Sequence, residues 1–143
     1  RAAGDASQAA RERFAEILPR VIARFLGDGP AVDEAVRAGG FEVHDVTVVI
    51  RLNPQTDAIE FFADIGLPDP HALESAYRAA LEINLCRTYP GIVLGLHPES
   101  GRLVATTSMH FLLVGDDDVC VNTVEMLTLQ VQRMRDSREV GVA

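Results

Sequence analysis

The sequence has no tryptophan, only two cysteines and no long uninterrupted apolar run. Cys86 and Cys120 form no CxxC pair, so they predict neither a disulfide framework nor a zinc site, and a reducing compartment is expected. A membrane-spanning helix needs roughly 18 consecutive apolar residues, and no such run occurs. Residues 1–10 are small and polar and lack the apolar core of a signal peptide. We therefore expect a cytoplasmic protein that does not insert into membranes.

Positive charge is also scarce. The chain has 13 basic and 21 acidic side chains, which gives a formal net charge of −8. Nucleic-acid binding depends on basic side chains that neutralise phosphates, so this balance argues against a nucleic-acid partner. Hydrophobic residues make up 48% and charged residues 24% of the sequence, an ordinary globular composition. The sequence predicts a single domain over residues 1–143, with residues 1–6 and 137–143 flexible.

Motifs of catalysis and cofactor binding are missing. The sequence contains no GxSxG, HExxH, GxGxxG or P-loop pattern. Asp116, Asp117 and Asp118 lack the alternating ligands and central glycine of a calcium loop, so they predict a solvated turn before a helix. No two histidines are spaced i, i+4 on a predicted helix. The four histidines are His44, His71, His97 and His110. We expect no catalytic residue, no metal and no cofactor.

Helical periodicity dominates the first part of the chain. Apolar side chains recur at i, i+3, i+4 and i+7, which predicts an amphipathic helix from about Ser7 to Leu26. Pro19 removes one backbone hydrogen bond and predicts a kink or a break near Leu18. A short helical turn is expected over residues 31–38, where Gly39 and Gly40 end it.

Alternation with a period of two follows. Residues 46–52 and 59–65, separated by a turn at 53–57, predict a β-hairpin with one face buried, and residues 41–43 predict a short leading strand. Val49 and Phe62 lie on the outward face of this hairpin. That face is therefore not fully polar.

A second helix, two strands and a last helix are predicted after the hairpin. Asp69 should cap the second helix and Pro70 should occupy its first position. Strands are expected over residues 92–96 and 103–113. The last helix should begin at Asp118 or at Asn122 and end near Arg135. The fold class is α+β, an antiparallel sheet flanked by helices in the order α-β-β-(β)-α-β-β-α.

The predicted elements carry more apolar side chains than one core needs. Val49 and Phe62 lie on the outward face of the hairpin, and Ile83 and Leu85 lie beside the main stripe of the second helix. A thick core with helices on both sheet faces would account for each of them singly. As a set they predict docking surfaces.

Two segments resemble a known family. Residues 80–85 read ALEINL and residues 90–104 read PGIVLGLHPESGRLV. They resemble the class I type III secretion chaperones, the Tir chaperone family, which have a leucine and an asparagine late in the second helix. In that family an LGL strand, an acidic turn with glycine, a long strand and a final helix follow. The chain departs from the family late in the last helix, where Met134 or Arg135 stands near the usual aromatic residue.

The resemblance implies a cytoplasmic bacterial homodimer without enzymatic activity or cofactor, and a role in virulence. Each dimer would bind the extended N-terminal segment of a secreted effector and keep it soluble and competent for secretion. The secretion apparatus ATPase is a further expected partner. The residues expected to contact the effector are Phe14, Ile17, Val21, Val49 and Phe62. The residues expected at the dimer interface are Tyr77, Leu81, Ile83 and Leu85.

Two other function classes stay open at this point. One is a small α+β regulatory domain that binds proteins outside secretion. The other is a small enzyme whose site is assembled from scattered residues such as His110 and Glu60, and a strongly perturbed acid or base in a pocket would favour it.

Overall fold

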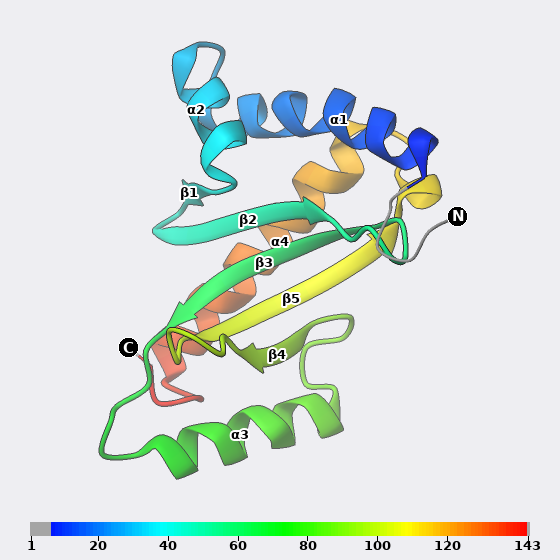
Figure 1. The fold of residues 1–143 in the computed structure, drawn as a ribbon. Helices are drawn as coiled ribbons and strands as arrows, with labels where there is room; N and C mark the ends of the chain where they lie inside the picture. Colours follow the sequence, from blue (N-terminus) through cyan, green and yellow to red (C-terminus); the bar gives the residue numbers. More distant parts are fainter. Residues whose placement is uncertain (1–6, 143) are drawn as a thin grey trace.

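Five antiparallel strands form one sheet in the spatial order β1-β2-β3-β5-β4, as seen in a computed structural model that describes residues 7–142 (Figure 1). The elements along the chain are α1 (Gln8–Leu26), α2 (Pro30–Ala38), β1 (Phe41–Val43), β2 (Val46–Leu52), β3 (Ala58–Gly66), α3 (Leu73–Cys86), β4 (Val93–Leu96), β5 (Leu103–His110), the 3-10 helix η1 (Phe111–Leu113) and α4 (Asp117–Ser137). The predicted fold class and element order are confirmed.

The core lies on one face of the sheet, which we call the covered face. Helix α4 packs behind β2, β3 and β5, and α1 crosses near β2 (Figure 1). The largest side chains buried there from the central strands and α4 include Val48, Ile59, Phe61, Leu103, Val124, Leu127 and Met134. Burying a side chain of this size stabilises the fold by about 1.5–3 kcal/mol before the entropy cost. The opposite face, turned away from α4, is called the open face below.

Helix α1 runs unbroken through Pro19, so a break at this residue is wrong. Ser7 caps the helix, its hydroxyl accepting from the Ala10 amide at 3.2 Å. Ile17 on one side of Pro19 and Val21 on the other both lie in the core. This tertiary burial compensates for the hydrogen bond that the proline removes, because most helical stability in proteins comes from a packed apolar face.

The short strand β1 joins β2 through a two-residue turn at His44 and Asp45. Both residues have positive φ, 49° and 62°, and Val43 pairs with Val46 across the turn. Positive φ at both central positions defines the hairpin turn whose twist matches the flanking strands. His44 and Asp45 are therefore turn residues.

The start of α3 differs from the prediction. The helix begins at Leu73 and has no side-chain cap, so Asp69 and Pro70 do not begin it. The Asp69 carboxylate accepts from the His71 amide at 2.9 Å, and the Asp69 amide donates to the Gly141 carbonyl at 3.2 Å. These bonds hold residues 69–72 in a turn, which is the alternative that Asp side chains offer to the backbone.

Strand β5 and helix α4 also have other limits than predicted. β5 ends at His110, where the imidazole Nδ1 accepts from the Leu112 amide at 3.2 Å and begins η1. Helix α4 begins at Asp117, one residue before the earlier of the two predicted starts, and Asp116 caps it through the Val119 amide at 3.4 Å. Carboxylates in the first turn favour this start through the helix dipole.

Residues after α4 pack back onto the body. Val140 is fully buried and Val142 is 6% exposed. The Tyr89 hydroxyl donates to the Glu139 carboxylate, 2.7 and 2.8 Å from its two oxygens. A Cβ at Gly66, whose φ is +131°, would lie 2.7 Å from Val142 Cγ1, so glycine is required there. Of the two ends expected to be flexible, residues 1–6 lie outside the described part of the chain.

Candidate functional site

An apolar row crosses the open face of the sheet. Val49 pairs with Phe62, Phe62 with Thr106 and Thr106 with Val93, so one line of side chains spans β2, β3, β5 and β4. A polar row lies on one side, where Arg51 pairs with Glu60. Side chains of one row point to one face because strand residues alternate. The prediction that Val49 and Phe62 lie on the outward face of the hairpin is confirmed.

A hollow of about 670 Å³ lies over three residues of this row, Val49, Phe62 and Thr106, and extends toward the turn between β4 and β5. Its lining includes Thr47, Val49, Arg51, Phe62, Asp64, Gly95, Leu96, His97, Arg102, Val104 and Thr106. The size falls within the roughly 300–1,000 Å³ of typical ligand-binding clefts. The hollow is mostly apolar with a few polar groups at its rim.

Two arginine–carboxylate pairs stand at the rim. Arg102 binds Asp64 in bidentate fashion, with Nε and Nη2 at 2.8 and 2.6 Å from the two carboxylate oxygens. The hydrogen bonds to Asp64 raise the pKa of Arg102 above its usual value. The Arg51 Nε donates to Glu60 at 2.8 Å, and its guanidinium carbon lies 4.8 Å from the centre of the Phe62 ring. Both carboxylates are neutralised locally, so the hollow does not share the negative charge of the chain.

A second apolar surface lies at the β4 edge of the sheet. Leu81 and Leu85, one helical turn apart on α3, are 68% and 84% exposed. Val93 and Leu96 of β4 are also exposed. We call these four residues the edge patch. Of the other residues expected at the dimer interface, Tyr77 and Ile83 are half-buried against the core. Large exposed apolar side chains gathered at one place are typical of protein interfaces.

Helix α1 does not join the open face. Ile17 and Val21 are 2% and 1% exposed and belong to the core on the covered face, and Phe14 packs half-buried against it. The structure therefore separates these three residues from Val49 and Phe62, although the sequence interpretation grouped all five as effector contacts. A side chain with so little exposure offers no surface to a partner in this conformation.

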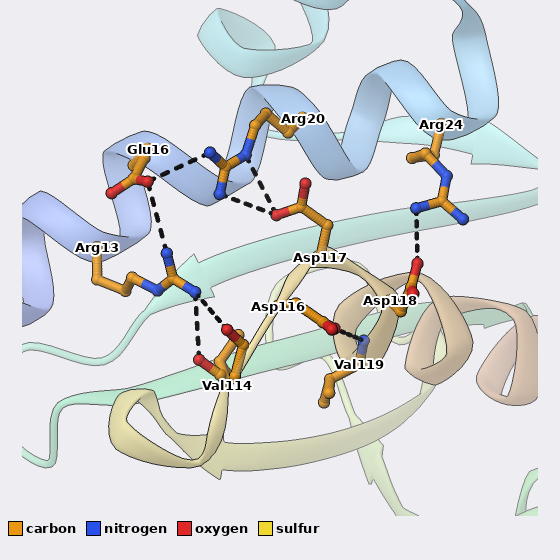
Figure 2. A network of polar contacts seen from close by, with 10 residues as sticks. Arg13, Glu16, Arg20, Arg24, Val114, Asp116, Asp117, Asp118 and Val119 are labelled. Carbon is orange, nitrogen blue, oxygen red and sulfur yellow. Dashed lines mark hydrogen bonds and ion pairs between the residues drawn. The ribbon is translucent and has the colours of Figure 1, made fainter.

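Three arginines of α1 form hydrogen bonds and ion pairs with the start of α4 and the residues just before it (Figure 2). Arg13 donates to the carbonyls of Val114 and Gly115 at 3.4 and 3.0 Å. Arg20 and Arg24 pair with Asp117 and Asp118 at 3.0 and 2.8 Å (Figure 2). The hydrogen bond that Arg24 donates to the Asp118 carboxylate raises the pKa of Arg24. Exposed ion pairs contribute little to stability, so this network orients α1 more than it stabilises the fold.

The groups considered for catalysis are dispersed. Glu60 accepts from Arg51 and from the Asn53 amide group at 3.2 Å, while the His110 ring accepts from a backbone amide. Burial raises the pKa of the Cys120 thiol to about 11, which keeps it protonated. Within residues 7–142, no group of three His, Cys, Asp or Glu side chains could hold a metal ion. No helix in that range is long and apolar enough to cross a membrane.

Three features of these surfaces were missed in the sequence. One arginine–carboxylate pair at the hollow joins residues far apart in the chain, Asp64 and Arg102, and only the folded sheet brings them together. Leu112, expected in a strand, lies in η1 and is 75% exposed. Gly95 lies in a strand beside open space, since a Cβ there would meet no atom within 4 Å. No local pattern distinguishes these cases.

No protein family and no curated protein matches the chain in sequence. A similar fold occurs in the solved structure of the HopA1-SchA chaperone–effector complex. The match has a TM-score of 0.65 at 13% identity and covers 91% of this chain and 98% of the other. Identity this low shows a shared fold, and the near-complete cover of both chains shows that the likeness extends over the whole domain.

Proposed function

We propose that the chain is a chaperone of type III secretion, of the class I group, that binds the N-terminal segment of a secreted effector. The observation that carries the proposal is the fold shared with a protein of a chaperone–effector complex, together with an open apolar hollow on its sheet. Binding of this kind needs neither a metal nor proton transfer, which agrees with the dispersed titratable groups.

The effector surface is assigned to the open face, with Val49 and Phe62 as its main contacts. Phe62 lies at the centre of the apolar row and forms part of the hollow. A large anchor side chain buried in such a hollow dominates binding energy. Ile17 and Val21 are not part of this surface themselves. They support it by packing on the covered face of the same sheet.

An extended effector segment also needs partners for its backbone, and the two sheet edges differ in what they offer. At the β4 edge, the Asn84 side chain already binds the amide and the carbonyl of Leu94. The β1 edge is the better site for an added strand, since strand addition depends on free backbone groups. The effector segment would pair with β1 and then continue across the open face, where its later side chains reach the hollow.

The functional unit is a homodimer formed through the edge patch. A two-fold interface brings the same surface from each copy together, and Leu81 and Leu85 are the most exposed side chains of α3 named for it. Val93 belongs to the apolar row and Leu96 lines the hollow, so this interface would lie beside the hollow and leave Val49 and Phe62 available to the effector. The complex would reside in the bacterial cytoplasm, where the secretion apparatus ATPase is a further partner.

The test begins with affinity capture from the cytoplasm of the producing bacterium, followed by mass-spectrometric identification of what binds. A secreted protein that binds through its N-terminal segment supports the proposal. Capture of a regulator that is never secreted, with binding at the same hollow, would establish the alternative of a regulatory interaction domain.

The second step measures affinity on variants. Phe62→Asp should weaken binding of that segment at least tenfold, about 1.4 kcal/mol, while the circular dichroism spectrum stays unchanged. Leu112→Asp is the matched control, because it introduces the same charge at an exposed apolar side chain outside the hollow. Unchanged affinity in a folded Phe62→Asp protein would remove this residue from the site.

A further inference from the structure

Gly95 leaves a gap in the wall of the hollow. It lies in the middle of β4 opposite Val104, which in turn pairs with Asp64, so all three belong to one row of the open face. Every other residue of this row has a side chain that projects over the sheet. The space above Gly95 is therefore part of the hollow beside the apolar row.

The fold itself does not require glycine at this position. A Cβ built on Gly95 would meet no atom within 4 Å, and Gly95 is not among the glycines with positive φ. Gly66 is the contrasting case, because a Cβ there would meet Val142. A glycine inside a strand costs about 0.5–1 kcal/mol relative to alanine. Such a glycine often marks a place where a ligand approaches the backbone closely.

Charge at the hollow is unlike that of the rest of the chain. The lining has two arginines and one carboxylate, whereas the whole chain has a net charge of −8. Asp64 is fully engaged by Arg102. Arg51 uses Nε for Glu60, and its side chain is 62% exposed beside Phe62. Its outward guanidinium edge therefore suits a carboxylate of the bound segment.

We propose that Gly95 sets the size of the anchor side chain that the hollow accepts, one large apolar side chain with a carboxylate nearby that pairs with Arg51. The proposal rests on the function proposed above and specifies the chemistry of the partner segment. The anchor lies over Phe62 and fills the space above Gly95. A larger side chain at position 95 would fill this space itself. The larger that side chain is, the less room remains for the anchor.

The probe is a library of random peptides displayed on phage, so no effector needs to be known. Peptides are selected on the wild-type protein after depletion on Gly95→Leu, which removes peptides that bind the edge patch or other surfaces. The selected peptides should share a large apolar residue with an acidic residue close to it. Their affinity should fall at least tenfold on Gly95→Leu and by a smaller factor on Gly95→Ala, as expected for a filled apolar pocket.

Two further variants complete the test. Arg51→Gln should abolish the preference for the acidic residue and leave the apolar preference intact. Gly115→Leu is the control for glycine replacement, because a Cβ at Gly115 also meets nothing within 4 Å and Gly115 lies outside the hollow. Gly95→Leu should melt at the wild-type temperature or above it, so lost affinity cannot be ascribed to unfolding.

The inference is overturned if depletion on Gly95→Leu leaves no peptides, or if the selected peptides bind Gly95→Leu and the wild type equally. It is also overturned if Gly95→Leu changes the mass of the assembly, since a second copy would then occupy the hollow. Peptide affinity that falls on the Gly95 variants, while no secreted protein is captured, would refute the chaperone function and leave the inference standing. Capture of a secreted protein, together with peptide binding that does not depend on Gly95, would support the chaperone function and refute the inference.

Discussion

The Asn84 side chain forms two hydrogen bonds with the backbone of Leu94, its nitrogen donating to the carbonyl at 2.9 Å and its oxygen accepting from the amide at 2.8 Å. One amide group thus replaces the missing neighbour strand at this edge of the sheet. It also joins α3 to β4 at a fixed register. Edge strands expose unpaired backbone groups that invite aggregation, and this contact removes two of them.

Replacing Asn84 by alanine should lower the free energy of unfolding by about 1–3 kcal/mol, because the partly buried amide and carbonyl of Leu94 lose their partners. Urea unfolding followed by circular dichroism measures the change. Asn122→Ala, an exposed position on α4, is the control and should be nearly neutral. Equal stability of the two variants would contradict the assigned role of Asn84.

The edge patch should hold two chains together. Light scattering at micromolar concentration should give a mass near twice 15.5 kDa. Leu81→Asp should give the single-chain mass, because a charge buried in an apolar interface has no partner. Leu113→Asp introduces the same charge at a similarly exposed leucine of η1 and should leave the dimer intact. A wild-type protein with the mass of one chain would refute the assigned interface.

The segment after α4 should contribute to stability. Val140→Ala should cost about 1–3 kcal/mol, since it removes buried methyl groups and leaves a cavity. The same substitution at the exposed Val93 should cost much less. Proteolysis adds an independent measurement, because a packed segment resists cleavage and a flexible one does not. Rapid removal of residues 138–142 from the folded protein, without loss of stability, would establish that this end is flexible.

Alkaline pH should weaken the attachment of the same segment through Tyr89. Burial and the hydrogen bond to Glu139 raise the pKa of Tyr89 to about 12, compared with about 10 in an unfolded chain. The folded state therefore retains its proton longer, so the contribution to stability is complete below pH 10 and is lost between pH 10 and 12. Tyr89→Phe should reduce the fall in stability over this range, as measured by denaturant unfolding at several pH values.

Strand and helix periodicity was sufficient to predict most of the fold. Alternation in residues 46–52 and 59–65 predicted the hairpin correctly, and helical spacing predicted α1. The start of α3 was predicted wrongly at Asp69 and Pro70. A hydrogen bond from the Asp69 amide to the distant Gly141 carbonyl decides the local conformation there. Helix signals of this kind are local, whereas the competing hydrogen bond spans most of the second half of the chain.

The candidate surfaces were harder to predict than the fold. Alternation placed Val49 and Phe62 on the outward face correctly, since the side-chain period of a strand is two. The same logic cannot separate a docking stripe from a core stripe on a helix, so Ile17 and Val21 were assigned to a partner although they lie in the core. The space beside Gly95 could not be predicted either, because it depends on the strands next to it.

The packing of Val140 and Val142 has a consequence for the order of events at the ribosome. Helix α3 emerges well before these two valines, and translation at about 5–20 residues per second needs roughly 3–11 s to pass from Cys86 to Val142. During that interval Gly66, at the end of β3, and Tyr89, just after α3, lack the contacts that they make with the later segment. The turn before α3 and the segment after it, which contact the end of the chain through Asp69 and Tyr89, therefore reach their final packing only after both valines have left the ribosome.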